Sequence, residues 1–258
     1  MINVGLVGAN GRMGQAIVEQ IKDKQDCFNL KCAIVADITT TANNVKEVAQ
    51  VCSEDMSMLQ GVDVVIDFAS PASSMVLLPF CIENNLPVMI GTTGFNDEEK
   101  LFVEKCAKKI PIILAPNTSL SVNVLFKIAE LVANKLRDFE VEIVEAHHRY
   151  KKDAPSGTAL KLGELISGAR GLALEEHATY SRQGISDTRH KDEIGFSVIR
   201  GGDIVGMHDV QFINDGEILS VKSQINNRRS FANGALLAAK FLLNKPAGLY
   251  TMFDVLGL

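Results

Sequence analysis

The segment Ile2-Asn-Val-Gly-Leu-Val-Gly-Ala-Asn-Gly-Arg-Met-Gly14 decides the fold of the first half of this chain. Residues 2–8 predict a short buried strand of a parallel sheet, because they are mostly apolar and rich in β-branched side chains. A helix should follow at once, with its apolar residues on one side (Met13, Ala16, Ile17, Ile21). Glycines at such a turn let the backbone approach a pyrophosphate, which the helix N-terminus attracts. The alternative is a tight turn without a ligand, since Gly8, Gly11 and Gly14 depart from the usual G-x-G-x-x-G spacing.

The next strand supports the dinucleotide interpretation. Residues 30–36 are apolar except for Lys31 and end at Asp37. An acidic residue at this place hydrogen-bonds the adenosine ribose in dinucleotide-binding folds. Strand, glycines, helix, strand and acid therefore occur in the expected order.

Strand and helix patterns continue to alternate through residue 119. Strands are expected at 62–68, 86–90 and 110–114, with helices opening near Pro71 and at the N-cap Asn96, which has Glu99 in its first turn. This alternation predicts a Rossmann-like, doubly wound parallel sheet, an α/β fold. Ligands bind beyond the carboxyl ends of such strands, so residues 91–94 and 115–118 should line the nicotinamide half of the site. Ordinary turn chemistry is the alternative for both segments.

The pattern changes in the second half. A long amphipathic helix is expected at 122–136, with apolar residues at helical spacing (Leu125, Ile128, Leu131, Val132, Leu136). A strand at 139–144 should deliver His147 and His148 from its end, and 156–168 should be helical. Strands at 194–200, 204–213 and 217–225 are predicted to form an antiparallel meander, because turn residues separate them (Gly201-Gly-Asp203, Asn214-Asp-Gly216).

Two domains follow from these patterns. Residues 1–119 form the dinucleotide-binding domain, and residues 229–258, which contain a final helix, return to it. Residues 120–228 form an α+β domain on a mixed or antiparallel sheet, with a role in substrate binding and oligomerisation. The open side of that sheet needs covering, which a homo-oligomer interface would do.

Composition indicates a cytoplasmic enzyme. Hydrophobic residues make up 47% of the 258, but no run reaches the roughly 18 that span a membrane, and no signal peptide is evident. The five cysteines include no C-x-x-C pair and predict reduced thiols (Cys27, Cys32, Cys52, Cys81, Cys106). The net charge of −5 argues against nucleic-acid binding.

The segment Glu145-Ala-His-His-Arg-Tyr-Lys-Lys-Asp-Ala-Pro-Ser-Gly-Thr-Ala159 carries the chemistry. It places two imidazoles and several cations before Pro155-Ser-Gly-Thr158, a natural helix opening that attracts anions. A small anionic substrate beside a proton donor would fit this arrangement. The alternative is a solvated basic turn.

Four segments together resemble the dihydrodipicolinate reductase family: residues 8–14, Gly91-Thr-Thr-Gly94, Ala115-Pro-Asn-Thr-Ser119 and 145–159. The likeness covers essentially the whole chain. It implies NAD(P)H-dependent reduction of 4-hydroxy-tetrahydrodipicolinate, a small dicarboxylate, to tetrahydrodipicolinate in diaminopimelate and lysine biosynthesis. It also implies a homotetramer and no membrane or nucleic-acid partner.

The resemblance assigns roles residue by residue. His147 and Lys151 match the acid–base pair, and three residues match the substrate-binding positions (His148, Gly157, Thr158). The cofactor positions are Gly8, Ala9, Asn10, Gly11, Arg12, Met13, Asp37, Gly91, Thr92, Thr93, Ala115, Pro116, Asn117 and Thr118. We expect the imidazole and ammonium groups to meet the reducing ring across a gap between the domains.

Residue chemistry agrees with these roles. Hydride addition to a conjugated imine leaves negative charge that a nearby acid must neutralise, and histidine has an unperturbed pKa of about 6.5. A hydrogen-bonded structural histidine is the alternative for His147 and His148 taken singly. No third ligand at a helpful spacing supports a metal site, and the remaining histidines lack a motif and are expected to be ordinary (His177, His190, His208).

The cofactor preference follows from the residues after Asp37. The next four are Ile38-Thr-Thr-Thr41, without the arginine that some family members use for the 2′-phosphate of NADPH. An aspartate here favours a free 2′-hydroxyl, so NADH should be used at least as well as NADPH. Arg12 and Lys46 stay open as alternative partners of a phosphate.

Two other functions remain open. Another nicotinamide oxidoreductase of two-domain build would explain the first 118 residues but not the His-His-x-x-Lys and Ser-Gly-Thr cluster. A non-catalytic dinucleotide sensor would explain cofactor binding but not charged groups at a helix opening.

Overall fold

The computed structural model describes residues 1–185 and 187–258. These residues form two compact units. Unit 1 comprises Met1–Leu120 and Arg228–Leu258, and unit 2 comprises Ser121–Asn227. The limits lie beside the pattern changes near residues 119 and 229. The binding roles assigned to the two domains stay predictions.

Unit 1 is built on a seven-stranded sheet in the order β12-β6-β5-β4-β1-β2-β3, with parallel neighbours throughout. This confirms the doubly wound parallel sheet. The strands are β1 (Ile2–Val7), β2 (Phe28–Ile34), β3 (Val51–Ser53), β4 (Val64–Asp67), β5 (Val88–Ile90), β6 (Pro111–Leu114) and β12 (Gly248–Tyr250). β3 and β12 were not predicted, because three residues are too few to show a period.

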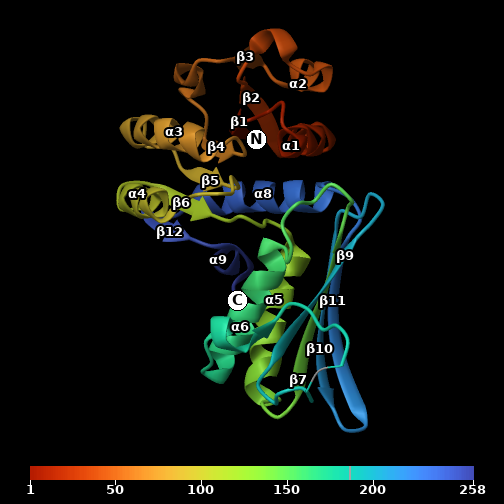
Figure 1. Ribbon diagram of the computed structural model, residues 1–258. Coiled ribbons are helices and arrows are strands. Elements are labelled where there is room, and N and C mark those ends of the chain that lie inside the picture. The colour runs from red at the N-terminus through yellow and green to blue at the C-terminus, as the bar shows by residue number, and fades with distance from the viewer. Residues whose placement is uncertain (186) are drawn as a thin grey trace. The chain divides into compact units, whose positions relative to one another are not determined.

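Helices cover both faces of this sheet (Figure 1). One face packs on α1 (Arg12–Asp23), α2 (Asn43–Val48), α8 (Arg229–Leu242) and α9 (Met252–Leu256), and the other on α3 (Pro71–Glu83) and α4 (Asp97–Ala107). Two short 3₁₀ turns, η1 (Ile38–Thr40) and η2 (Met56–Leu59), lie in the connections. The predicted cap of α4 is confirmed: Asn96 Oδ1 accepts from the Glu99 N–H at 2.9 Å, and Glu99 Oε2 accepts from the Asn96 N–H at 2.8 Å.

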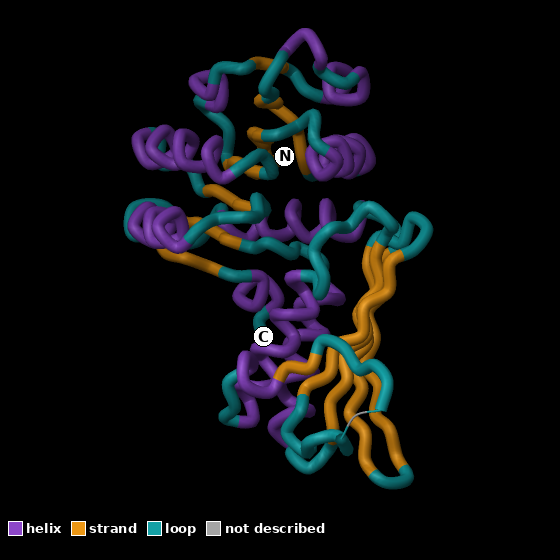
Figure 2. Tube along the Cα trace, viewed as in Figure 1, coloured by secondary structure: helices purple, strands orange, loops and turns teal. Residues whose placement is uncertain are grey.

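Unit 2 is built on a five-stranded mixed sheet in the order β11-β10-β7-β9-β8 (Figure 2). Its strands are β7 (Glu140–His147), β8 (Ala178–Thr179), β9 (Ile194–Arg200), β10 (Gly206–Asn214) and β11 (Glu217–Ile225). The helices are α5 (Leu120–Lys135), α6 (Gly157–Arg170) and α7 (Leu174–His177), and α6 contacts both β7 and β9.

The predicted antiparallel meander is wrong at its first step. β10 and β11 form the expected hairpin, but β7 lies between β9 and β10, parallel to the first and antiparallel to the second. Residues 201–205 therefore cross the end of β7, where the Gly201 N–H donates to the His147 carbonyl at 3.0 Å. A local turn signal does not show that a third strand enters between two consecutive ones.

The helix predicted at 122–136 forms as α5, but its buried side differs from the predicted one. Leu125 is buried, whereas Ile128 and Leu131 are 37% and 58% exposed. The other buried apolar residues of α5 are Val122, Phe126, Ala129 and Ala133. Apolar residues occupy much of the circumference of this helix, so their spacing alone did not select the packed side.

Close packing of α8 gives a test of the unit 1 core. A Cβ on Gly234 would stand 1.7 Å from the carbonyl oxygen of Thr118, a backbone atom that cannot swing away. We therefore expect Gly234→Ala to lower the free energy of unfolding by about 1–3 kcal/mol or more. Gly168→Ala is the matched control, because a Cβ there meets nothing within 4 Å. Thermal denaturation compares the two, and a Tm of Gly234→Ala at or above wild type would contradict the packing.

Candidate active site

The residues predicted to bind the cofactor gather at one edge of the unit 1 sheet. They follow the carboxyl ends of β1, β2, β5 and β6, which lie in the order β6-β5-β4-β1-β2 within one parallel sheet (Figure 1). Parallel strands bring their carboxyl ends to the same edge, where open α/β sheets bind ligands. Four segments far apart in the sequence thus share one edge.

The glycine turn after β1 is shaped by backbone contacts. Gly8 has φ +81°, and a Cβ on it would stand 2.5 Å from the carbonyl oxygen of Phe68. A Cβ on Gly14 would stand 2.3 Å from the carbonyl oxygen of Gly8, so α1 packs directly on the turn. Gly11 is the N-cap of α1 and has no side chain to occupy the first-turn N–H groups. The turn therefore fits a pyrophosphate, which would accept from those N–H groups.

Asn10 holds this turn to the segment after β2. Its Oδ1 accepts from the Ala42 N–H at 3.1 Å, and its own carbonyl accepts from Gln15 Nε2 at 2.9 Å. The side chain of this residue is therefore committed to shaping the loop, and a cofactor would meet its backbone.

Asp37 lies at the end of β2, as predicted for the ribose-binding acid. Its Oδ1 accepts from the Thr39 hydroxyl at 2.6 Å and from the Thr39 N–H at 2.8 Å, and these hydrogen bonds hold the pKa of the exposed carboxyl below its usual value. Glu54 lies close by, because its Oε1 accepts from the Ile38 N–H at 2.8 Å. Two carboxylates thus stand at the place expected for the ribose.

The segments after β5 and β6 are tied to the sheet. The Gly91 N–H donates to the Asp67 carbonyl at 2.8 Å, and a Cβ on Gly91 would stand 2.1 Å from the Phe68 ring. Thr118 Oγ1 donates to the Phe231 carbonyl at 2.7 Å. Thr92 is buried, whereas Thr93 and Pro116 are exposed at this edge.

Asp67 is a buried residue that sequence reasoning missed. Burial raises its pKa, and hydrogen bonds from the Ser74 hydroxyl and the Ala69 N–H partly offset that effect. Its position at the end of β4 makes it an anchor for the turn that carries Phe68. No motif marks it, because a carboxyl group at the end of an apolar strand resembles an ordinary turn residue.

In unit 2, β7 carries His147, the proposed acid, and places it next to other polar side chains. Val141, Ile143, Glu145 and His147 alternate along one side of the strand, and the first three are buried. The register places Arg200 of β9 beside His147, and His208 of β10 beside Glu145. Two apolar side chains are thus followed by two polar ones on the same packed face.

Glu145 is the best-connected group of this cluster. It is 1% exposed and contacts His147 Nδ1 at 2.6 Å. Arg200 donates to both of its oxygens, at 2.8 and 2.7 Å, and the Ser156 N–H donates to Oε1 at 2.9 Å. Burial raises the pKa of Glu145, but these hydrogen bonds outweigh it and bring the pKa to about 2. Glu145 therefore stays ionised at neutral pH.

Glu145 was included in the segment 145–159 in the sequence analysis but was assigned no role there, and Arg200 was not identified. The alternation of residues 141, 143, 145 and 147 was the available signal for Glu145. Arg200 had none, because its place beside His147 comes from the pairing of β9 with β7.

The prediction that His208 is ordinary is wrong. It is 4% exposed, its Nε2 lies 3.1 Å from Ser156 Oγ, and its ring meets the His147 ring edge-on at 5.2 Å between centroids. Burial and the neighbouring His147 lower the pKa of His208 to about 4. The sequence gives no motif for it, because strand pairing alone brings it to the cluster.

The other predicted residues of unit 2 surround the start of α6. Ser156 caps this helix, accepting from the Ala159 N–H at 3.3 Å, and Gly157 and Thr158 open its first turn. Lys151 Nζ pairs with Asp153 Oδ2 at 2.8 Å, and the ring of His148 lies 6.3 Å from that of Tyr150. The structure therefore brings His147 to the Glu145 cluster and places Gly157 and Thr158 at a helix N-terminus.

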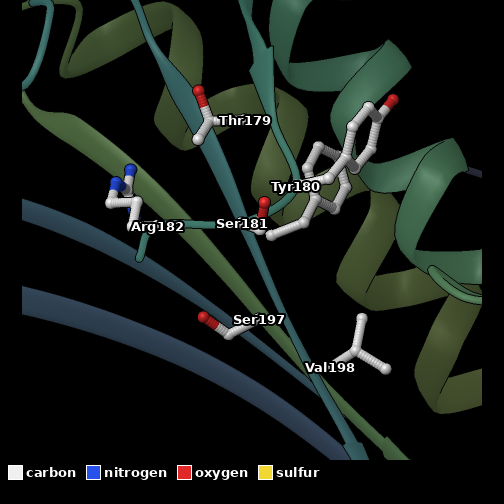
Figure 3. Close-up of a pocket in the computed structure, with 7 residues that line it drawn as sticks. Thr179, Tyr180, Ser181, Arg182, Ser197 and Val198 are labelled. Atoms are coloured by element: carbon white, nitrogen blue, oxygen red, sulfur yellow. The ribbon is translucent and has the colours of Figure 1, made fainter. Parts of the chain in front are cut away.

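A separate cavity of about 400 Å³ lies beside β8 and β9 (Figure 3). It is lined by Thr179, Tyr180, Ser181, Arg182, Phe196, Ser197 and Val198, and none of these is a predicted site residue. Arg182 already pairs with Glu142 at 2.9 Å, and Tyr180 stacks on Phe196. The cavity therefore offers no uncommitted cation to an anionic substrate.

Residues 1–185 and 187–258 contain no group of three or more His, Cys, Asp or Glu side chains placed to hold a metal ion. None of the helices in these residues is long and apolar enough to cross a bilayer.

Comparisons with known proteins agree over the whole chain. Residues 2–118 match the family domain described as "Dihydrodipicolinate reductase, N-terminus", and residues 121–256 match its C-terminal counterpart. The chain is 44% identical to the 4-hydroxy-tetrahydrodipicolinate reductase of Nitrosomonas eutropha, covering 100% of this chain and 99% of that one. It is 42% identical to the enzyme of the same name from Hahella chejuensis, with 100% of both covered.

Solved structures extend the comparison. A dipicolinate-bound dihydrodipicolinate reductase from Paenisporosarcina sp. TG-14 superposes with a TM-score of 0.78 at 25% identity, covering 98% of each chain. An amine dehydrogenase from Mycobacterium smegmatis gives a TM-score of 0.60 at 11% identity, over 97% of this chain and 95% of that one, which indicates a shared fold only.

The buried His208 gives a test by pH. Its pKa is about 4 in the folded chain, against about 6.5 for an unfolded histidine. Between these values only the unfolded chain binds the proton, so stability falls as the pH drops through this window. The loss attributable to His208 should reach about 2–3 kcal/mol near pH 4.5. Glu145 loses its contribution only below this window, since its pKa is about 2.

We therefore expect the Tm of His208→Gln to fall less than that of wild type between pH 7 and pH 4.5. Glutamine retains a hydrogen-bonding group for Ser156 but does not titrate. Differential scanning calorimetry at the two pH values makes the comparison. An equal fall in both proteins would assign the pH dependence to other groups.

Proposed function

This chain belongs to the dihydrodipicolinate reductase family and is an NAD(P)H-dependent oxidoreductase of diaminopimelate and lysine biosynthesis, and we propose which of its residues reduce 4-hydroxy-tetrahydrodipicolinate to tetrahydrodipicolinate. The observation that carries the assignment is the 2.6 Å contact between His147 Nδ1 and the buried Glu145. It gives one imidazole a fixed orientation beside a helix start suited to a carboxylate.

His147 is the proton donor in this proposal. When Nδ1 donates to Glu145, Nε2 is the nitrogen that remains for the substrate. Negative charge that develops on the substrate is neutralised by the Nε2 proton. A positioned acid of this kind contributes roughly 10²–10⁴-fold in rate.

Lys151, His148 and the start of α6 hold the substrate. A carboxylate of the dicarboxylate would accept from the first-turn N–H groups of Gly157 and Thr158 and gain from the helix dipole. Lys151 would exchange its ion pair with Asp153, at 2.8 Å, for the substrate or donate a proton there. The Asp153 partner holds this ammonium in place before the substrate arrives.

The cofactor binds along the carboxyl edge of the unit 1 sheet. Its pyrophosphate lies against residues 8–13, and the nicotinamide half lies against residues 91–93 and 115–118. When bound, the reduced nicotinamide supplies the hydride. Hydride transfer needs reacting atoms roughly 3–3.5 Å apart, so in the reacting complex the substrate held by unit 2 must reach the nicotinamide held by unit 1.

The enzyme uses NADH at least as well as NADPH in this proposal. The support is the negative charge after the end of β2, where Asp37 and Glu54 each accept a hydrogen bond from a backbone N–H of η1. Two carboxylates favour a ribose hydroxyl and repel a phosphate. Arg12 remains the alternative phosphate partner, because it is exposed at the start of α1.

A homotetramer in the cytoplasm completes the proposal. Its support is the sheet of unit 2, where Ile199 and Ile218 are 47% and 65% exposed. Burying such side chains against another copy of the chain would remove apolar surface from water. Analytical ultracentrifugation tests this assembly directly.

The first prediction concerns the cofactor. We expect kcat/KM with NADH to equal or exceed that with NADPH, because a 2′-phosphate would face two carboxylates. A spectrophotometric assay coupled to freshly generated substrate, run with both reduced cofactors, measures it. A preference for NADPH above tenfold would overturn it. Binding of NADH without its oxidation would favour a dinucleotide sensor.

The second prediction concerns the proton donor and the substrate cation. His147→Gln should lower kcat roughly 10²–10⁴-fold while leaving cofactor binding intact, because it removes the acid and not the unit 1 site. Lys151→Ala should lower kcat and, where it contacts a carboxylate, raise KM for the substrate. The control is His190→Gln, an exposed histidine outside the cluster. Turnover like wild type in both test variants would remove the proposed roles.

A further inference from the structure

Glu145 contacts two parts of the proposed unit 2 site, the proton donor and the residue that caps α6. Its Oε2 contacts His147 Nδ1, and its Oε1 accepts from the N–H of Ser156, the residue that caps α6. Arg200 donates to both oxygens. One buried carboxylate therefore connects the proton donor at the end of β7 with the helix start that would hold the substrate.

Arg200 is itself fixed by more than Glu145. Its Nη2 donates to the Asp153 carbonyl at 2.6 Å, and its Nη1 donates to the Ile199 carbonyl at 2.8 Å. Asp153 belongs to the loop between β7 and α6 that also carries Lys151. The guanidinium thus holds the carboxylate from one side and the lysine-bearing loop from the other.

We propose that Glu145, held by Arg200, is a positioning residue for the reduction: it orients His147 so that Nε2 faces the substrate. The inference rests on the proposed function, in which His147 donates the proton. Gly206 lies next to His147 Nε2, because a Cβ added at that glycine would stand 3.3 Å from this nitrogen. The glycine keeps the space beside Nε2 open.

The geometry around His147 shows what its orientation depends on. Glu145 is the carboxylate in contact with Nδ1, and Arg200 and the Ser156 N–H hold that carboxylate from its other side. A glutamine at position 145 would keep the size of the side chain but carry one acceptor oxygen in place of two, so it could not serve His147 and the other donors together. The ring would then lose its fixed orientation, and kcat would fall because Nε2 would no longer be held toward the substrate.

A purely structural clamp predicts a different result. If Glu145 only joined β7, β9 and α6, its replacement would lower the stability and the fraction of folded enzyme. It would not lower the kcat of the molecules that fold. The kcat per folded molecule therefore separates positioning of the acid from support of the fold.

The decisive experiment uses Glu145→Gln in the full chain. We expect kcat at pH 7.5 to fall about 10²–10⁴-fold, in the range seen when a carboxylate that orients a catalytic histidine becomes an amide. KM for NADH should stay within twofold of wild type. Circular dichroism measures the folded fraction, to which kcat is normalised. A folded variant with kcat within threefold of wild type would overturn the proposal.

A second variant covers the case in which Glu145→Gln does not fold. Leaving Arg200 buried without its partner is strongly destabilising, whereas removing both charges costs much less. In Glu145→Gln/Arg200→Met, kcat should fall as far as in the single variant. A folded double variant with kcat within threefold of wild type would also overturn the proposal.

Controls separate this inference from the proposed function. Glu140→Gln makes the same change on the same strand at a side chain that is 43% exposed, and it should leave kcat unchanged. His147→Gln is run in parallel. If it keeps full activity, the proposed acid is wrong. If it loses at least 100-fold while folded Glu145 variants behave like wild type, only the positioning role is wrong.

Discussion

Burial of the Glu145 carboxylate is the constraint around which unit 2 is organised. A buried ionised carboxylate without partners costs several kcal/mol, so charge and hydrogen-bond donors must reach it from several directions. They come from β9 through Arg200, from β7 through His147 and from the entry to α6 through Ser156. The position of β7 between β9 and β10 makes this possible, because it puts the strand that carries Glu145 next to both neighbours. The mixed sheet is thus what allows the polar cluster to be buried.

Unit 1 is organised by the backbone turns at one edge of its parallel sheet and not by a buried charge. Its parallel strands bring their carboxyl ends to one edge, and the turns there must come close to each other and to a ligand. Gly8 and Gly14 allow that approach, since side chains at either position would collide with backbone atoms. Gly11 leaves the first turn of α1 without a side-chain cap, which suits an anion. The predicted cofactor site therefore depends on backbone geometry, while the proposed unit 2 site depends on paired charges.

The two polar clusters of unit 2 differ in whether any of their side chains keeps an atom that a substrate could contact. Arg182, Glu142, Arg189 and Glu193 join β7 to the segment before β9, and the cations of that network are spent on carboxylates and carbonyls. In the Glu145 cluster one ring nitrogen of His147 is engaged and the other faces Gly206. An ion-pair network can stabilise a sheet, but a side chain exchanges a proton with a substrate only through an atom that is not already held by another partner. This difference is why we propose that the cluster at the end of β7 carries the chemistry.

Local patterns determined much of this protein on their own. The β1 turn, the alternating strands and helices of unit 1, the cap at Asn96 and the helix start at Ser156 depend on neighbouring residues, so the sequence was enough to predict them. It also indicated His147 and Lys151 through their spacing and a family resemblance. Tertiary structure alone decided which strands pair. Whether β7 enters between β9 and β10, and whether Arg200 and His208 reach Glu145, depends on contacts between residues more than 50 positions apart. No local pattern encodes such contacts, because the free energy that selects them comes from packing and charge compensation in the folded chain.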